Sequence, residues 1–134
     1  MRRQIALITF VGLFAALGFL LLGAESALPE RVATHFGADG LPNGWTPRDG
    51  FTKSITAVVI LPVAIVYGIG LLLGRLPPSL INLPNRDYWL APERRTKTID
   101  HIRTAMLEFG NATFAFLLFV VWSIIQANSS PSVA

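Results

Sequence analysis

Three long apolar runs dominate the pattern of hydrophobic and polar positions. They cover residues 5–23, 55–73 and 105–125. A helix needs about 20 apolar residues to cross the roughly 30 Å hydrocarbon core of a bilayer. The first two runs contain no charged residue, and the third carries Glu108 and Asn111 before a strongly apolar stretch. The pattern therefore predicts an all-α integral membrane protein with three transmembrane helices in a single membrane domain.

The composition supports a membrane as the solvent of this chain. Of the 134 residues, 52% are hydrophobic and only 14% are charged, which is outside the range of ordinary soluble domains. The chain has no cysteine, so disulfides, thiolate metal sites and cysteine nucleophiles are excluded. No basic stripe is interleaved with aromatic residues, so a nucleic-acid partner is not expected.

The first apolar run has two interpretations. Residues 1–3 include two arginines, and residues 24–27 read Ala-Glu-Ser-Ala, so a cleavable signal peptide is an alternative. The apolar run is longer than the roughly 7–15 residues of a signal-peptide core. We therefore expect an uncleaved membrane anchor.

The lysine and arginine positions predict the orientation, because basic loops are retained on the cytoplasmic side. Two arginines precede the first span, and six basic residues lie in the loop at 74–104 or at its end. The loop at 24–53 has three, and the tail after the third span has none. The N-terminus and the 74–104 loop are expected inside, with the 24–53 loop and the C-terminus outside.

The outer loop is predicted to be compact and rich in turns. Pro29 ends the first helix, and residues 31–36 alternate weakly, which allows a short extended segment. The following turn residues include the pair Asn43-Gly44. Thr46 is expected to be the N-cap of the second helix, with Pro47 at its first position.

The inner loop is predicted to contact lipid. Prolines end the second helix, and a new helix is expected to begin at Pro92 and to run to about Ile125, a length of some 50 Å. Its basic first turns would meet anionic headgroups. The segment 82–95 favours an interfacial anchor, with a docking site for a cytoplasmic partner as the alternative. Its candidate contact residues are Asn85, Tyr88, Trp89, Arg94 and Arg95.

The outer loop resembles the signature of a known family. Residues 28–36 read Leu-Pro-Glu-Arg-Val-Ala-Thr-His-Phe, and residues 40–45 read Gly-Leu-Pro-Asn-Gly-Trp. This resembles the bacterial domain of unknown function 1648 family, and the run at 82–95 is similar to that of its short stand-alone members. The resemblance covers roughly residues 10–110. It implies two helices joined by this loop in a multi-pass protein of the bacterial inner membrane.

The same domain forms the N-terminal part of SdpI-type immunity proteins. These multi-span membrane proteins protect a producer from its own toxin and can signal to a repressor. The resemblance therefore implies an immunity-related role, although this chain lacks the further spans of the longer proteins.

Several residues are candidates for chemistry. His35, with Glu30, Asp39 and Asp49 nearby in sequence, could bind a metal or sense pH, but packing within the loop is favoured because no second histidine has ligand spacing. Glu108 is costly in hydrocarbon. The favoured interpretation is an interfacial position or a pair with Arg103 or Lys97, and the alternative is a proton or ligand pathway.

Small residues and a proline mark the second span. Gly70 and Gly74 form a small-xxx-small pair that predicts close helix packing, with homodimerisation as a less favoured alternative. Glu108 and Asn111 are expected on one face of the third span, where they could join the same packing. Pro62 could act as a hinge or a simple bend.

Three functions fit these features. The preferred hypothesis is a non-enzymatic membrane protein without metal or cofactor, because no catalytic motif is present. Its outer loop would bind or sense a ligand. The first alternative is an accessory subunit of a larger membrane complex, and the second is an oligomeric transporter that uses Glu108. Expected partners are the lipid bilayer and another membrane protein or a second copy. The candidate recognition residues are His35, Phe36, Gly40, Pro42, Gly44 and Trp45.

The orientation is testable with single cysteines, because the chain has none of its own. Cysteines introduced at Asn43, Ser79 and Ser132 are expected to react with a membrane-impermeant thiol reagent from outside, inside and outside respectively. Labelling of intact cells and of inverted vesicles measures this. External reactivity at residue 79 would overturn the orientation.

Overall fold

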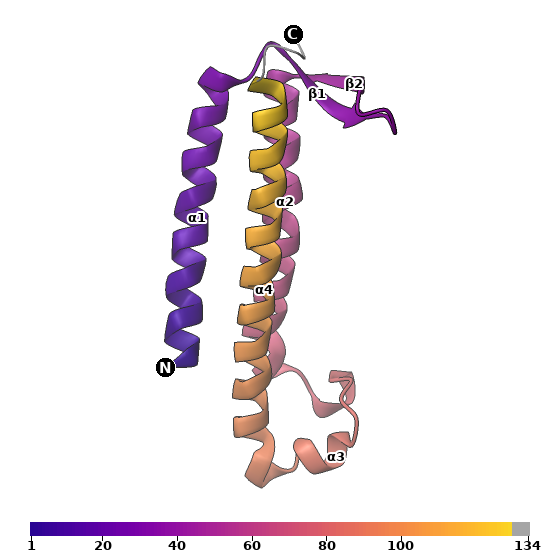
Figure 1. Ribbon diagram of the computed structural model, residues 1–134. Coiled ribbons are helices and arrows are strands. Elements are labelled where there is room, and N and C mark those ends of the chain that lie inside the picture. The colour runs from indigo at the N-terminus through magenta and orange to yellow at the C-terminus, as the bar shows by residue number, and fades with distance from the viewer. Residues whose placement is uncertain (130–134) are drawn as a thin grey trace.

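Three long helices lie side by side in the computed structural model, which describes residues 1–129 (Figure 1). A β-hairpin lies at one end of the helices, and a loop with a short helix lies at the other. The elements are α1 (Arg2–Ala27), β1 (Arg31–Phe36), β2 (Pro42–Pro47), α2 (Arg48–Leu72), the 3-10 turns η1 (Leu73–Arg75) and η2 (Pro78–Leu80), α3 (Arg86–Trp89) and α4 (Pro92–Ser129).

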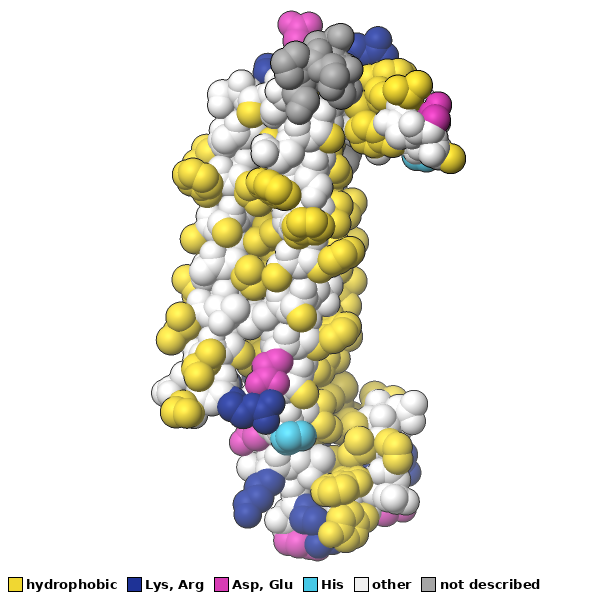
Figure 2. Space-filling view, in the orientation of Figure 1, with side chains coloured by type: hydrophobic (Ala, Val, Ile, Leu, Met, Phe, Trp, Pro, Cys, Tyr) yellow, Lys and Arg dark blue, Asp and Glu magenta, His cyan; other side chains and the backbone are white. Residues whose placement is uncertain are grey.

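All three long helices are apolar and long enough to cross a bilayer, which confirms the three predicted spans. Most of their side chains in the apolar windows are not buried inside the molecule. On the face shown in Figure 2, charged side chains gather toward the two ends, and hydrophobic ones cover the length between them. The chain is therefore a membrane protein whose exposed apolar surface suits lipid.

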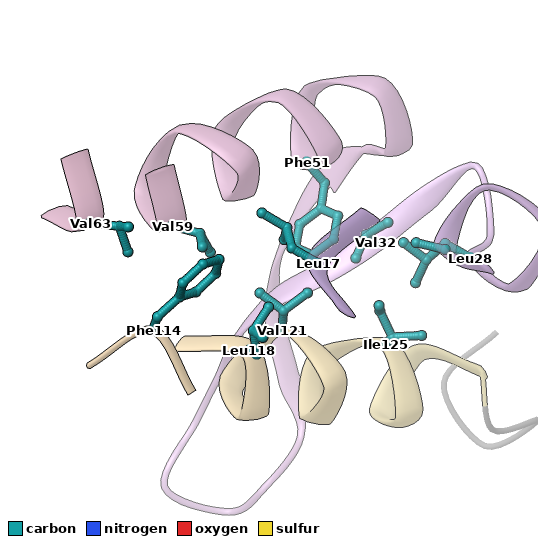
Figure 3. Packing of buried hydrophobic residues seen from close by; sticks show 11 residues of the cluster. Leu17, Leu28, Val32, Phe51, Val59, Val63, Phe114, Leu118, Val121 and Ile125 are labelled. Atoms are coloured by element: carbon teal, nitrogen blue, oxygen red, sulfur yellow. The ribbon is translucent and has the colours of Figure 1, made fainter. Parts of the chain in front are cut away.

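Helix α4 organises the core, because α1 and α2 each make their main helix contacts with it. Phe114 of α4 is fully buried and points toward Val59 and Val63 of α2 (Figure 3). The same cluster extends toward the hairpin, where Val32 lies near Phe51. Its buried members are Leu17, Ala24, Leu28, Val32, Phe51, Val59, Val63, Phe114, Leu118, Val121 and Ile125.

The outer loop corrects two predictions. It is a two-stranded antiparallel hairpin with two irregularities in register, so the fold is not purely α-helical. Thr46 is not the N-cap of the second helix. It lies in β2 opposite Val32, and α2 begins at Arg48 with Pro47 as its cap residue. The strand continues directly into the helix, so its backbone groups pair with β1 and leave no free turn for a capping side chain.

Asn128 joins the hairpin to the helices. Its Oδ1 accepts a hydrogen bond of 2.7 Å from the Ala33 N–H, and its Nδ2 donates one of 3.0 Å to the Ala33 carbonyl. Ala33 is fully buried, and Asn128 is nearly so. Because a buried backbone group without a partner is costly, this side chain satisfies both polar groups of Ala33 at once. The hairpin is thereby held at a defined place on α4.

Two arginines contact carbonyls at helix C-termini. Arg48 Nη1 lies 3.2 Å from the Glu25 carbonyl and 3.3 Å from the Leu28 carbonyl, at the end of α1. Arg103 Nε donates to the Gly70 carbonyl at 3.1 Å, near the end of α2. Carbonyls in the last turn of a helix generally lack a partner within that helix, and a cation favours the negative end of the helix dipole. Each contact therefore joins two helices.

The end opposite the hairpin has a small core of its own, formed by Leu73, Ile81, Leu90 and Ile99. Asn85 adopts a left-handed backbone conformation with φ of 52° at the start of α3. Helix α4 begins at Pro92 as predicted and is helical through Ser129, the last described residue, which is four residues beyond the expected Ile125. Helix α2 runs through Pro62 without a break.

The N-terminus and the two loops lie at the ends of the helices where three crossings of a bilayer would place them. The N-terminus lies toward the end with the inner loop, and the hairpin lies at the end where α4 finishes (Figure 1). This grouping agrees with three crossings. Which end faces the cytoplasm stays a prediction, and the Ser132 site of the labelling test lies outside the described residues.

Replacing Asn128 by leucine is expected to release the hairpin from α4. The change keeps the side-chain size but leaves the N–H and C=O of Ala33 buried without partners, at a cost of about 2–4 kcal/mol. Hydrogen exchange of peptides covering 31–36 should become much faster in the variant. Ser123→Ala, at a half-buried position of the same helix where the hydroxyl donates to the Phe119 carbonyl, is the control and should leave exchange unchanged. Equal protection in Asn128→Leu would contradict the anchoring role.

Candidate functional site

The hairpin presents apolar side chains to its surroundings. Phe36, Leu41 and Trp45 are 37%, 64% and 46% exposed. The tip is a tight turn, in which the Gly37 N–H donates to the Leu41 carbonyl at 2.8 Å and Gly40 takes a positive φ of 77°. The buried pair Val32 and Ala33 holds the base of the hairpin against the helices. The geometry therefore offers an ordered apolar surface at the end of the bundle.

His35 has a structural partner within the hairpin. Its ring Nδ1 shares a hydrogen bond with the Asn43 side-chain oxygen. Gly44 lies opposite His35 in register, and a Cβ on Gly44 would come within 3.0 Å of the His35 Cβ, so a side chain there would crowd the pair. Among residues 1–129 no group of three or more His, Cys, Asp and Glu side chains could hold a metal ion. The geometry favours packing over metal binding for His35.

The other predicted hairpin residues complete this surface. Pro42 pairs with Phe36 at the end of the two strands. Asp39 does not contact His35 but accepts a hydrogen bond of 3.0 Å from the Leu41 N–H. The candidate recognition residues therefore lie together. The exposed His35 is hydrogen-bonded to Asn43, and the other large exposed side chains of the group, Phe36 and Trp45, are apolar.

Asn111 links all three long helices. Its Nδ2 donates to the Ala6 carbonyl of α1 at 2.8 Å, and its Oδ1 accepts a hydrogen bond from the Tyr67 hydroxyl of α2. Asn111 is buried, so its amide is satisfied inside the bundle. Interhelical hydrogen bonds of this kind stabilise helix association in a membrane.

Close packing surrounds this polar link. Gly110 precedes Asn111, and a Cβ at Gly110 would lie 2.9 Å from the Tyr67 ring, so only glycine fits without a shift. The Phe10 ring of α1 packs on Tyr67 with centroids 4.4 Å apart. Glycine and aromatic rings therefore allow α1, α2 and α4 to meet around one amide.

Glu108 pairs with the N-terminal segment, not with Arg103 or Lys97 as expected. Arg2 donates from Nε at 3.1 Å and from Nη2 at 2.7 Å to the two carboxylate oxygens. The two side chains are 67% and 39% exposed. Sequence proximity favoured Arg103, but that residue contacts the end of α2 instead. The pair supports a packing role for Glu108 at the edge of the bundle.

The two glycines of the second span face α4 of the same chain. A Cβ on Gly70 would lie 3.9 Å from Met106, an ordinary contact. A Cβ on Gly74 would lie 2.5 Å from the Arg103 Nη2, so Gly74 makes room for the guanidinium. The two glycines thus allow α2 and α4 to pack closely, and α4 covers the face that a second copy would need.

The inner loop exposes two aromatic side chains. Tyr88 and Trp89 stand edge to face with ring centroids 5.1 Å apart, and both are exposed. Arg94 covers the Tyr88 ring at 4.1 Å and donates to the Tyr88 carbonyl at 2.8 Å. Aromatic rings beside arginines suit the headgroup region of a bilayer. The arrangement favours the anchor interpretation of this segment.

Sequence reasoning missed three residues that hold these sites together. Asn128 and Tyr67 were not considered as partners, and Arg48 was counted only as a loop charge. A signal for Asn128 existed, because an amide at the end of an apolar helix must find a hydrogen-bond partner. Its partner could not be named, because Ala33 contributes only backbone groups.

These features define a class, a small membrane protein with three long helices and a β-hairpin between the first two. Residues 5–66 match the family described as "Domain of unknown function (DUF1648)". The match covers α1, the hairpin and most of α2, and it confirms the resemblance to this family seen in the loop. The match ends before the inner loop and α4, so it is shorter than expected. The searches of curated proteins and of solved structures each gave no match.

The Tyr67–Asn111 hydrogen bond is testable by a double-mutant cycle. Tyr67→Phe and Asn111→Leu should each lower the free energy of unfolding in detergent micelles, and their coupling is expected to be about 0.5–2 kcal/mol. Tyr88→Phe, at an exposed tyrosine, should have no effect. Additive effects of the two substitutions would show that the hydroxyl and the amide are not coupled.

Proposed function

We propose that this chain is a non-enzymatic recognition protein of the bacterial inner membrane. Its hairpin would bind the apolar part of a membrane-active peptide or protein at the outer surface. The observation that carries this proposal is the exposure of Phe36, Leu41 and Trp45 on a hairpin that Asn128 fixes to α4. An exposed apolar patch at a fixed place is typical of an interaction site.

The chemistry of the hairpin favours an apolar partner. Near the tip, Asp39 accepts a hydrogen bond from the Leu41 backbone and the His35 ring is bonded to Asn43, so polar groups are used within the hairpin. Near the tip and along β2, the large side chains that remain free to make contacts are Phe36, Leu41 and Trp45, which are aromatic or aliphatic. Aromatic residues supply much of the binding energy in protein interfaces. A partner that already lies in the membrane surface would meet them without leaving the bilayer.

The resemblance to SdpI-type proteins supports a peptide toxin as the first class of partner to examine. In that role the protein would lower the toxin's access to the membrane by holding it at the hairpin. The positive-inside distribution supports an outer position for the hairpin, where such a peptide would arrive. Helix α4 connects the hairpin to the basic inner loop, which offers a route for signalling to a cytoplasmic partner.

A second candidate, an accessory subunit, is favoured by a different surface. An apolar groove between α1 and α4 is lined by Ala15, Ala16, Phe19, Leu118 and Trp122, among others. Small residues at its floor would allow another transmembrane helix to approach closely. The glycine pair of the second span, a candidate for close helix packing, faces α4 of the same chain instead.

The third candidate, transport through Glu108, receives less support. Glu108 is engaged by Arg2 at the edge of the bundle, and Asn111 beside it is fully hydrogen-bonded between helices. Loss of proton-coupled transport on Glu108→Gln alone would favour it.

Site-specific photo-crosslinking distinguishes the first two candidates. A photoreactive amino acid replaces Leu41 in the tagged full chain, and the cells are irradiated in the presence of their own secreted peptides. We expect a peptide or protein adduct, identified by mass spectrometry. Phe36→Ser with Trp45→Ser should reduce its yield about tenfold or more, because these aromatic contacts are expected to carry much of the binding energy.

Two control positions make the result specific. A photoreactive residue at Ala38, exposed at the same tip, reports on chance proximity. One at Phe19 in the groove reports on a helix partner. A stoichiometric membrane-protein adduct at residue 19 with none at 41 would favour the accessory subunit. Lipid adducts alone at 41 would overturn recognition by the hairpin.

A further inference from the structure

A basic pocket lies between the end of α2 and the first turns of α4. Its volume is about 270 Å³, and its lining includes Gly74, Arg75, Arg95, Thr96, Asp100 and Arg103. Three guanidinium groups therefore face one carboxylate, so the pocket carries a net positive charge. It is separate from the hairpin at the other end of the helices.

Hydrogen bonds to backbone carbonyls fix two of the arginines without neutralising them. Arg95 Nη2 donates to the Leu76 carbonyl at 2.9 Å, and Arg103 Nε donates to the Gly70 carbonyl at 3.1 Å. A guanidinium has further N–H groups in a planar fork, which match the oxygens of a phosphate. Arginines held in place in this way lose little freedom when an anion binds.

The third arginine is free to meet a ligand. Arg75 is exposed and has no hydrogen-bond or ion-pair partner within residues 1–129. Asp100 supplies one negative charge and pairs with Arg103 Nη1 at 3.8 Å, so the charges of Arg75 and Arg95 have no ion-pair partner within residues 1–129. Gly74 has no side chain to fill the pocket.

The location selects a lipid over a free anion. The pocket lies where α2 ends, at the boundary between hydrocarbon and headgroups for a helix that spans the bilayer. Leu71 and Leu72, one turn earlier, are 71% and 50% exposed and would contact acyl chains. Basic pockets between transmembrane helices are suited to anionic headgroups.

We propose that this pocket binds the phosphate of one anionic phospholipid, with Arg75, Arg95 and Arg103 as its donors. The lipid would bridge η1 and α4 and stabilise the turn that follows α2. This site does not depend on the role of the hairpin.

Native mass spectrometry of the tagged full chain tests the site. The protein is released from nanodiscs that contain equal amounts of phosphatidylglycerol and phosphatidylcholine. We expect one retained phosphatidylglycerol for each wild-type chain. Arg75→Gln and Arg95→Gln should each lower its retention about tenfold, because each removes a charge-assisted hydrogen bond. Lys97→Gln removes the same charge from α4 outside the pocket lining and should retain the lipid.

The outcomes separate the possible ligands. Arg75 is exposed, so Arg75→Gln should fold normally, and circular dichroism of each variant checks this. Equal retention of both lipids, or retention that Arg75→Gln and Arg95→Gln leave unchanged, would overturn the proposal. Binding of added inorganic phosphate without retention of lipid would also overturn it, because the site would then serve a free anion.

Discussion

The structure depends on the rule that polar groups buried in an apolar environment must be paired. Two asparagines of α4 satisfy this rule, one where the hairpin meets α4 and one where the three long helices meet. Asn128 pairs with both backbone groups of buried Ala33, and Asn111 joins the Ala6 carbonyl to the Tyr67 hydroxyl. Because an unpaired group there would cost more than one lost hydrogen bond normally contributes, these contacts determine how the helices and the hairpin meet.

Helix α4 is the element on which the other parts are arranged. It is 38 residues long, or about 57 Å, so it passes beyond the hydrocarbon core. Along this length it contacts the hairpin, packs Phe114 into the apolar core, and places Arg103 at the end of α2. The DUF1648 match covers α1 and the hairpin but not α4, so the helix that anchors the hairpin lies outside the matched segment.

The two ends of the molecule have different surface chemistry. The hairpin exposes Phe36, Leu41 and Trp45, whereas the opposite end presents arginines in a pocket and aromatic rings beside it. Two helices join these ends, because β2 continues directly into α2 and Asn128 holds the hairpin on α4. The separation agrees with the two roles proposed for these ends, apolar recognition at one and contact with anionic lipid at the other.

The sequence by itself determined the three spans, the start of α4 at Pro92 and the similarity to the DUF1648 family, because hydropathy, helix-starting residues and a loop motif are local properties of the chain. It did not reveal the hairpin, although residues 31–36 allowed an extended segment, because strand pairing depends on a partner segment as well as on propensity. Only the tertiary structure decided that Glu108 pairs with Arg2 and that Asn128 pairs with Ala33, since these partners are 106 and 95 positions apart. A buried polar side chain shows that it needs a partner, but the packing of helices decides which distant group comes within hydrogen-bond distance.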